Sequence, residues 1–381
     1  VTVTDSSVSA SDLNTLNTKT DYNITVNATA ISGSLSDVST LYGNKAADSN
    51  AATDGFTGLG NEAITVSDTG SVAANTLTTI ATANSSGTLN VSAAGTITGT
   101  AGQIIAAFAD STITEASDVA LTVDTANSGT ATLTQARSLD GLTTGVVTAT
   151  IAATDLSDLV GSSPLLDANG NNAFTITIGT DDATVAAADL NTLDGLTTVA
   201  INAGNVTTIT SSSLADINTL YASSGFSGLG DQAITANDTG SIAASTITTV
   251  ATANSSGTLN VSAAGTITGT AAEIIAAFAD GTVTEASDVA LTVNSGTATL
   301  AEARSLDGLT TGVVTATIAD TVVSDLLGSS PLLDANSNNA FTITIGTADA
   351  EITAANLTSL NGLTTVAIDA TNVTQITGTV A

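Results

Sequence analysis

Internal repetition at two lengths constrains the fold of this chain more than any other feature. Residues 84–112 recur, with three substitutions, as residues 254–282, and Phe174 returns as Phe341 about 170 residues later. A chain that repeats itself this closely folds as an array of similar units. The long period divides the sequence into a first super-repeat at 1–172, a second at 173–339 and the start of a third at 340–381.

A shorter period lies inside the long one. Each super-repeat contains about six units of about 28 residues. A unit opens with a β-branched strand such as 24–26, continues through a small-residue turn into a second strand such as 96–98, and ends in a short helix such as 11–16. Ser, Thr or Asp before the helix predicts an N-cap. Glycines after it predict a left-handed stop, at Gly141, Gly195, Gly308 and Gly362.

One such unit is too small to bury its apolar side chains alone, but it buries them when stacked on its copies. We therefore predict a repeat β-solenoid, with parallel strands, one short helix per coil and about 28 residues per coil, forming an elongated rod. A string of immunoglobulin-like sandwiches is the alternative. It would need about seven strands in about 100 residues, usually with a core Trp, and this chain has no Trp.

The amino-acid composition argues against several classes of function. The net charge is −31, with 35 acidic and four basic residues, and this argues against nucleic-acid binding, which depends on Lys and Arg at the phosphates. No apolar run is long enough for a membrane span, so we expect no membrane insertion. The chain has no His and no Cys, the commonest general base and the thiol nucleophile. We therefore expect no enzymatic activity.

Two Asp- and Asn-rich loops are the candidate metal sites. Oxygen ligands at alternating positions are what a calcium loop requires, because this hard cation takes six to eight oxygens from a compact turn. The pattern lacks the Gly at position 6 and the Glu at position 12, and an Asx turn after Pro164 or Pro331 explains it equally. A weaker candidate is the loop with Asp48, Asn50 and Asp54. The predicted calcium ligands are Asp167, Asn169 and Asn171, and Asp334, Asn336 and Asn338.

Three segments carry a resemblance to a known class of protein. Residues 188–198, 145–151 and 267–274 resemble the tandem repeats of very large secreted surface and matrix proteins of marine cyanobacteria and other aquatic bacteria. The resemblance covers essentially the whole chain and implies an extracellular or cell-surface location. The glycine-rich nonapeptide that binds calcium in such proteins is absent here, so the resemblance does not supply a calcium site.

Repetition without recognisable chemistry favours a structural protein of the bacterial cell surface or matrix, as a filament, sheath or surface-layer component. The alternatives are an adhesin stalk or a glycan- or cell-binding module and, with less support, an ice-binding protein or a polysaccharide-acting enzyme. Neither end of the sequence has the pattern of a capping element, so we expect the array to continue, either into further residues of a longer polypeptide or into the next subunit, head to tail. The expected partner is the protein itself, through end-to-end or lateral assembly. Surface polysaccharide is a second expected partner.

Overall fold

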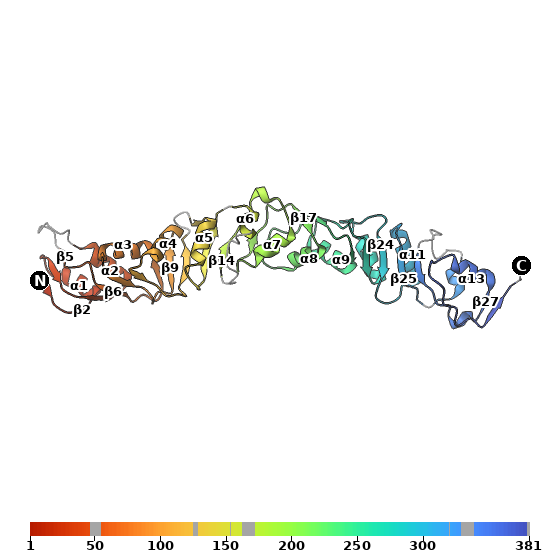
Figure 1. Cartoon of the computed structure of the whole chain (residues 1–381), viewed down its shortest axis with the longest axis horizontal. Coiled ribbons are helices and arrows are strands. Elements are labelled where there is room, and N and C mark those ends of the chain that lie inside the picture. Colours follow the sequence, from red (N-terminus) through yellow and green to blue (C-terminus); the bar gives the residue numbers. More distant parts are fainter. Residues whose placement is uncertain are drawn as a thin grey trace. The chain divides into compact units, whose positions relative to one another are not determined.

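The computed structural model describes residues 1–45, 55–124, 129–152, 154–161, 172–319, 321–328 and 339–378. Within them, short parallel strands alternate with short helices (Figure 1). The internal contacts divide the chain into two compact units. The first unit comprises Val1–Gly179 and Thr192–Asn202, and the second comprises Thr180–Asn191 and Ala203–Ala381.

The first unit contains three parallel sheets, in which the pairing partners are distant in sequence. The first sheet consists of β1 (Thr2–Val3), β3 (Ile24–Val26) and β5 (Phe56–Thr57). The second consists of β2 (Ser7–Ser9), β4 (Ala30–Gly33), β6 (Ala63–Val66), β8 (Thr88–Asn90) and β10 (Ile113–Thr114). The third consists of β7 (Ser71–Ala73), β9 (Thr96–Gly99), β11 (Ala120–Val123), β13 (Val147–Ile151), β12 (Thr130–Ala131) and β14 (Ala173–Thr175).

Helices connect these strands, and α1 to α4 each pack on the next helix in the chain. They are α1 (Ala10–Asn17), α2 (Leu35–Gly43), α3 (Ala74–Asn84), α4 (Ala101–Ala109), α5 (Leu133–Asp140) and α6 (Leu156–Val160). Each is short and has one buried face, which is typical of a helix stabilised by its neighbours rather than by its own propensity.

The second unit repeats this arrangement. One sheet consists of β15 (Thr184–Val185), β17 (Thr208–Ser212), β19 (Ala233–Ala236), β21 (Thr258–Asn260) and β23 (Val283–Thr284). Another consists of β20 (Ser241–Ala243), β22 (Thr266–Gly269), β24 (Ala290–Val293), β25 (Val314–Thr317) and β26 (Ala340–Thr342), and β27 (Glu351–Thr353) pairs with β28 (Gln375–Thr377). The helices are α7 (Ala187–Asp194), which begins in this unit, α8 (Leu214–Ala222), α9 (Ala244–Ala253), α10 (Ala271–Ala279), α11 (Leu300–Leu309), α12 (Val323–Leu326) and α13 (Ala354–Asn361).

Rows of stacked aliphatic side chains form the core. Because the strands pair in register, Ile31 of β4 stacks on Ile64 of β6, and Ile64 on Leu89 of β8. All three side chains are fully buried. The second unit has the same row in Ile209, Ile234 and Leu259. Inward Ile, Leu and Val alternate with outward small polar residues, which is the pattern of strands buried on one face.

Strand pairing corrects the expected period of about 28 residues per coil. Most paired strands lie 23 to 26 residues apart, as in Thr2 with Thr25 and Leu121 with Val147. The helices do follow the longer spacing, since α13 begins 167 residues after α7, over six helix steps. The position of the helix relative to the sheets therefore changes along the chain. Helix α1 directly follows β2, whereas α3 directly follows β7, which belongs to another sheet.

The left-handed stops predicted after the helices are wrong. Gly141 and Gly362 have right-handed φ values of −73° and −76°, and Gly308 lies inside α11. The Gly141 N–H still bonds to the Arg137 carbonyl, and the next N–H, of Leu142, bonds to Leu139 O at 3.1 Å. The helix thus ends through one tighter turn, in which no residue needs a positive φ.

The N-termini of several helices donate a hydrogen bond to the repeat unit that follows them in the chain. The first N–H of α2, at Leu35, donates to Asp68 Oδ2 at 2.6 Å, although the two residues are 33 apart in sequence. Helix α8 repeats this bond from Leu214 to Asp238 at 2.7 Å, and α12 from Val323 to Asp349 at 2.8 Å. An N-terminal N–H without a partner is costly when buried, so these carboxylates join neighbouring coils.

Candidate functional site

The predicted calcium ligands Asp167, Asn169, Asn171, Asp334, Asn336 and Asn338 lie outside the described residues, as do Asp48, Asn50 and Asp54. In the part of the chain that the structure describes, no three acidic side chains gather where they could hold a metal ion. Calcium binding by these loops therefore stays a prediction.

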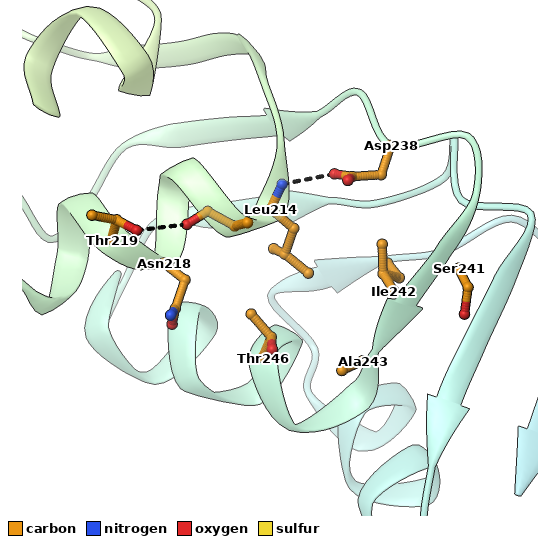
Figure 2. A pocket seen from close by; sticks show the side chains of 9 residues that line it. Leu214, Asn218, Thr219, Asp238, Ser241, Ile242, Ala243 and Thr246 are labelled. Atoms are coloured by element: carbon orange, nitrogen blue, oxygen red, sulfur yellow. Dashed lines mark hydrogen bonds between the residues drawn. The ribbon is translucent and has the colours of Figure 1, made fainter. Parts of the chain in front are cut away.

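A groove in the second unit is the candidate functional site. It has a volume of about 370 Å³ and lies between α8, the strand β20 and the start of α9 (Figure 2). Leu214 and Ile242 are buried beneath it, while Ala215 and Ser241 are exposed at its surface. Its full lining is Leu214, Ala215, Asn218, Thr219, Asp238, Ser241, Ile242, Ala243 and Thr246.

Some polar groups of the groove make hydrogen bonds within the protein, and others do not. Asp238 uses Oδ2 to accept from the Leu214 N–H at 2.7 Å, and Thr219 Oγ1 donates to the Ala215 carbonyl at 3.0 Å (Figure 2). One oxygen of Asp238 remains for a ligand, because only the other makes that bond. The side chains of Asn218 on α8 and Thr246 on α9 are half-buried and line the groove.

The chemistry that these groups support is hydrogen bonding. Asp238 is the only ionisable residue in the lining. Acid–base catalysis commonly requires a second titratable group of different pKa nearby, and the lining supplies none. Hydroxyl, amide and carboxylate groups together offer both donors and acceptors, which suits a neutral polar ligand.

Similar positions recur along the chain. A second groove of about 360 Å³ lies between α12, β27, β28 and the start of α13. It also contains an aspartate, Asp349, bonded to the first N–H of the preceding helix. In the first unit, Asp68, Ser71 and Thr76 occupy the positions that Asp238, Ser241 and Thr246 occupy in the second.

A buried polar network links adjacent repeat units in both parts of the chain. In the first, the Tyr42 hydroxyl donates to Glu62 Oε2 at 2.6 Å, and Asn84 bonds through its amide to the Glu62 backbone N–H and carbonyl. Burial, and then the bond to Glu62, raises the pKa of Tyr42 well above its usual range. In the second unit, Tyr221, Gln232 and Asn254 make the equivalent contacts. Burial raises the pKa of Tyr221 also.

The two units differ at the centre of this network. Glu62 Oε1 is buried and has no hydrogen-bond partner. The corresponding Gln232 Nε2 donates to Val206 O, Gly228 O and Asp231 Oδ1 at 3.0–3.3 Å. A buried polar atom without a partner costs about 1–3 kcal/mol.

We expect Glu62→Gln to raise the free energy of unfolding by about 1–3 kcal/mol, because the amide gains donors where the carboxylate has an unpaired acceptor. The reverse change, Gln232→Glu, should lower it by a similar amount. Urea denaturation of both variants at neutral pH measures the two effects. Loss of stability in Glu62→Gln would mean that the carboxylate charge itself is needed.

A pair of half-buried glutamates gives a pH-dependent expectation. Burial raises the pKa of Glu115, and the Asp110 charge adds to the rise. Burial and Asp280 do the same to Glu285 in the second unit. A carboxyl whose pKa is raised on folding stabilises the protein below the unfolded value of about 4.3. That contribution is lost as the pH rises through the folded pKa.

We expect the double variant Glu115→Gln, Glu285→Gln to lose this part of the pH dependence. From pH 4 to 7, the parent should lose stability relative to the variant, since the amide does not titrate. Urea denaturation at a series of pH values measures the difference, with the exposed Glu351→Gln as control. Parallel stability curves for parent and double variant would contradict the expectation.

Sequence reasoning missed the groove and the buried network, although a signal for each existed. Asp68 and Asp238 precede equivalent strands in the two copies, and Glu62 and Gln232 stand before matching strands. Their partners lie 11 to 33 residues away, however, and local pattern does not reveal such bonds.

Among the described residues, no helix has the length and apolar character needed to cross a bilayer. Comparison with protein-family models, with curated proteins and with solved structures finds no match to this chain.

Proposed function

We propose that this protein is a non-enzymatic structural component of the bacterial cell surface or extracellular matrix, and that each unit is a β-solenoid. The supporting observation is the stacking of equivalent strands, in which Ile31, Ile64 and Leu89 continue one buried row from coil to coil. In such an array each coil is stabilised by its neighbours, so length can be added without a new core. Length is what a surface scaffold or spacer requires.

Composition supports the same proposal. A net charge of −31 favours the solubility of a repetitive protein. The absence of His and Cys removes the residues on which most acid–base and thiol catalysis depends. The groove beside α8 carries a single ionisable group. These features favour a structural or binding role over catalysis.

Small-angle scattering and imaging of the native cell surface test the proposal. A compact domain of 381 residues has a radius of gyration of about 21 Å. A solenoid array should give a clearly larger value and a rod-like scattering profile. Antibody labelling should then find the protein on intact cells. A compact particle would overturn the solenoid, and a protein confined to the cytoplasm would overturn the surface role.

Calcium is expected to raise the melting temperature through the two Asp- and Asn-rich loops, because binding to the folded state alone stabilises by mass action. The double variant Asp167→Ala, Asp334→Ala should lose this response, while Asp189→Ala, on a helix, should keep it. Thermal unfolding in calcium and in chelator measures the shift. An unchanged response in the double variant would leave these loops as turns only.

Self-assembly is part of the structural proposal. End-to-end contact between identical arrays is heterologous and does not close on itself, so it produces filaments. Sedimentation over a concentration series should reveal growth of the particle. A strictly monomeric chain at high concentration would remove the filament role and leave that of a single-chain spacer.

A further inference from the structure

We propose that the groove between α8 and α9 binds a neutral sugar unit of a polysaccharide. This inference goes beyond the structural role, which would hold equally for a chain without ligands. It rests on four observations about the groove: its unused hydrogen-bonding groups, its apolar floor and volume, its charge and its recurrence.

Unused polar groups face the groove from three elements. Asn218 on α8 offers a side-chain amide with both donors and an acceptor, and Thr246 on α9 offers a hydroxyl. Asp238 offers its second carboxylate oxygen, since the Leu214 N–H occupies only Oδ2. Figure 2 shows these side chains around one space, with Ser241 at its edge. A sugar hydroxyl both donates and accepts, so a polyol can satisfy amide, hydroxyl and carboxylate together.

The apolar part of the lining fits the C–H face of a sugar ring, which carries no hydroxyl groups. Ile242 and Leu214 are buried under the groove, and Ala215 and Ala243 present methyl groups along it. The volume of about 370 Å³ falls near the lower end of small-molecule sites, about 300–1,000 Å³. A groove of this size accommodates a small ligand or one segment of a polymer.

Charge selects against acidic polymers. The lining contains one carboxylate and no Lys or Arg, so a uronic acid or a sulfated sugar would meet repulsion without a compensating cation. The net charge of the chain adds to this repulsion at low ionic strength. The groove therefore fits a neutral sugar.

A second groove of similar composition would raise the affinity of the chain for a polymer. The groove that contains Asp349 and Asn356 also combines carboxylate side chains, here Asp349 and Glu351, with hydroxyl and amide side chains and has no Lys or Arg. A single shallow site of this kind binds in the millimolar range, about −4 kcal/mol. Several sites on one chain raise the apparent affinity for a polymer by about 10²–10⁴, provided that the polymer reaches more than one of them.

Affinity electrophoresis of the full chain tests the proposal. Native gels containing dextran, mannan or galactan are compared with gels containing alginate, an anionic polymer. At least one neutral polysaccharide should retard the parent protein, and alginate should not. The double variant Asn218→Ala, Thr246→Val removes two hydrogen-bonding groups from the groove and should weaken retardation about tenfold or more.

Asn294→Ala is the matched control, since Asn294 is exposed and lies outside the groove lining. It should be retarded like the parent, and the melting curves of all variants establish that they are folded. The proposal is overturned if no neutral polysaccharide retards the parent, if alginate alone retards it, or if the folded double variant behaves like the parent. A negative result leaves the scattering test of the structural role unaffected.

Discussion

Phe174→Ala is expected to lower the free energy of unfolding of the first unit by about 3–5 kcal/mol. Phe174 is fully buried in β14 and pairs with Ala149 in β13. Few aromatic residues are present, at 2 % of the chain, so no second large side chain is at hand to fill the space. The cost combines the lost burial with the cavity that remains. Phe341→Ala should have the same effect in the second unit, where Phe341 pairs with Ala316.

Urea denaturation of the full chain, followed by circular dichroism, measures this loss. Phe108→Ala removes the same atoms from a half-buried position on α4, and so it should cost clearly less. Equal losses at Phe108 and Phe174 would mean that burial in this fold does not govern the contribution of the aromatic side chains.

Asn84→Ala is expected to cost about 1–3 kcal/mol, because it leaves the buried Glu62 N–H without a partner. It also removes one of two bonds from the Tyr42 hydroxyl and from the Glu62 carbonyl. The Asn84 side chain accepts from the Glu62 N–H at 3.0 Å and from the Tyr42 hydroxyl at 2.9 Å. It also donates to the Glu62 carbonyl at 2.8 Å. Asn254→Ala should be as costly, since Asn254 makes the same bonds to Gln232 and Tyr221.

The control is Asn75→Ala on the same helix, where the side chain is exposed and stability should change by no more than about 0.5 kcal/mol. Hydrogen exchange adds a local measurement. The amide of Glu62 should exchange faster in Asn84→Ala than in the parent. Unchanged stability and exchange would show that the bonds across the coil boundary are dispensable.

Local sequence predicted the local structure well. The strands expected at 24–26 and 96–98 are β3 and β9, and the helix expected at 11–16 is α1, which is one residue longer at each end. These elements follow from period and capping, which are properties of neighbouring residues. Ser9, for example, accepts from the Asp12 N–H at the start of α1.

Features that depend on the following coil could not be predicted in this way. The strand-pairing offset of 23 to 26 residues is set by how each coil rests on the last, whereas the sequence pattern follows the helices. The groove likewise brings Asn218 together with Thr246, which lies on a different helix 28 residues later. A single sequence shows which residues are present, but it does not show which of them contact each other across such distances.

The bonds from one coil to the helix before it impose an order on folding. During synthesis the residues of α2 emerge before their N-terminal partner Asp68, and those of α8 before Asp238. Each of these helices is complete only when the next coil arrives, so the newest coil is always the least stable one. Folding should thus advance from the N-terminus with a lag of one coil. A protease acting during synthesis would cut at that front and leave the older coils intact.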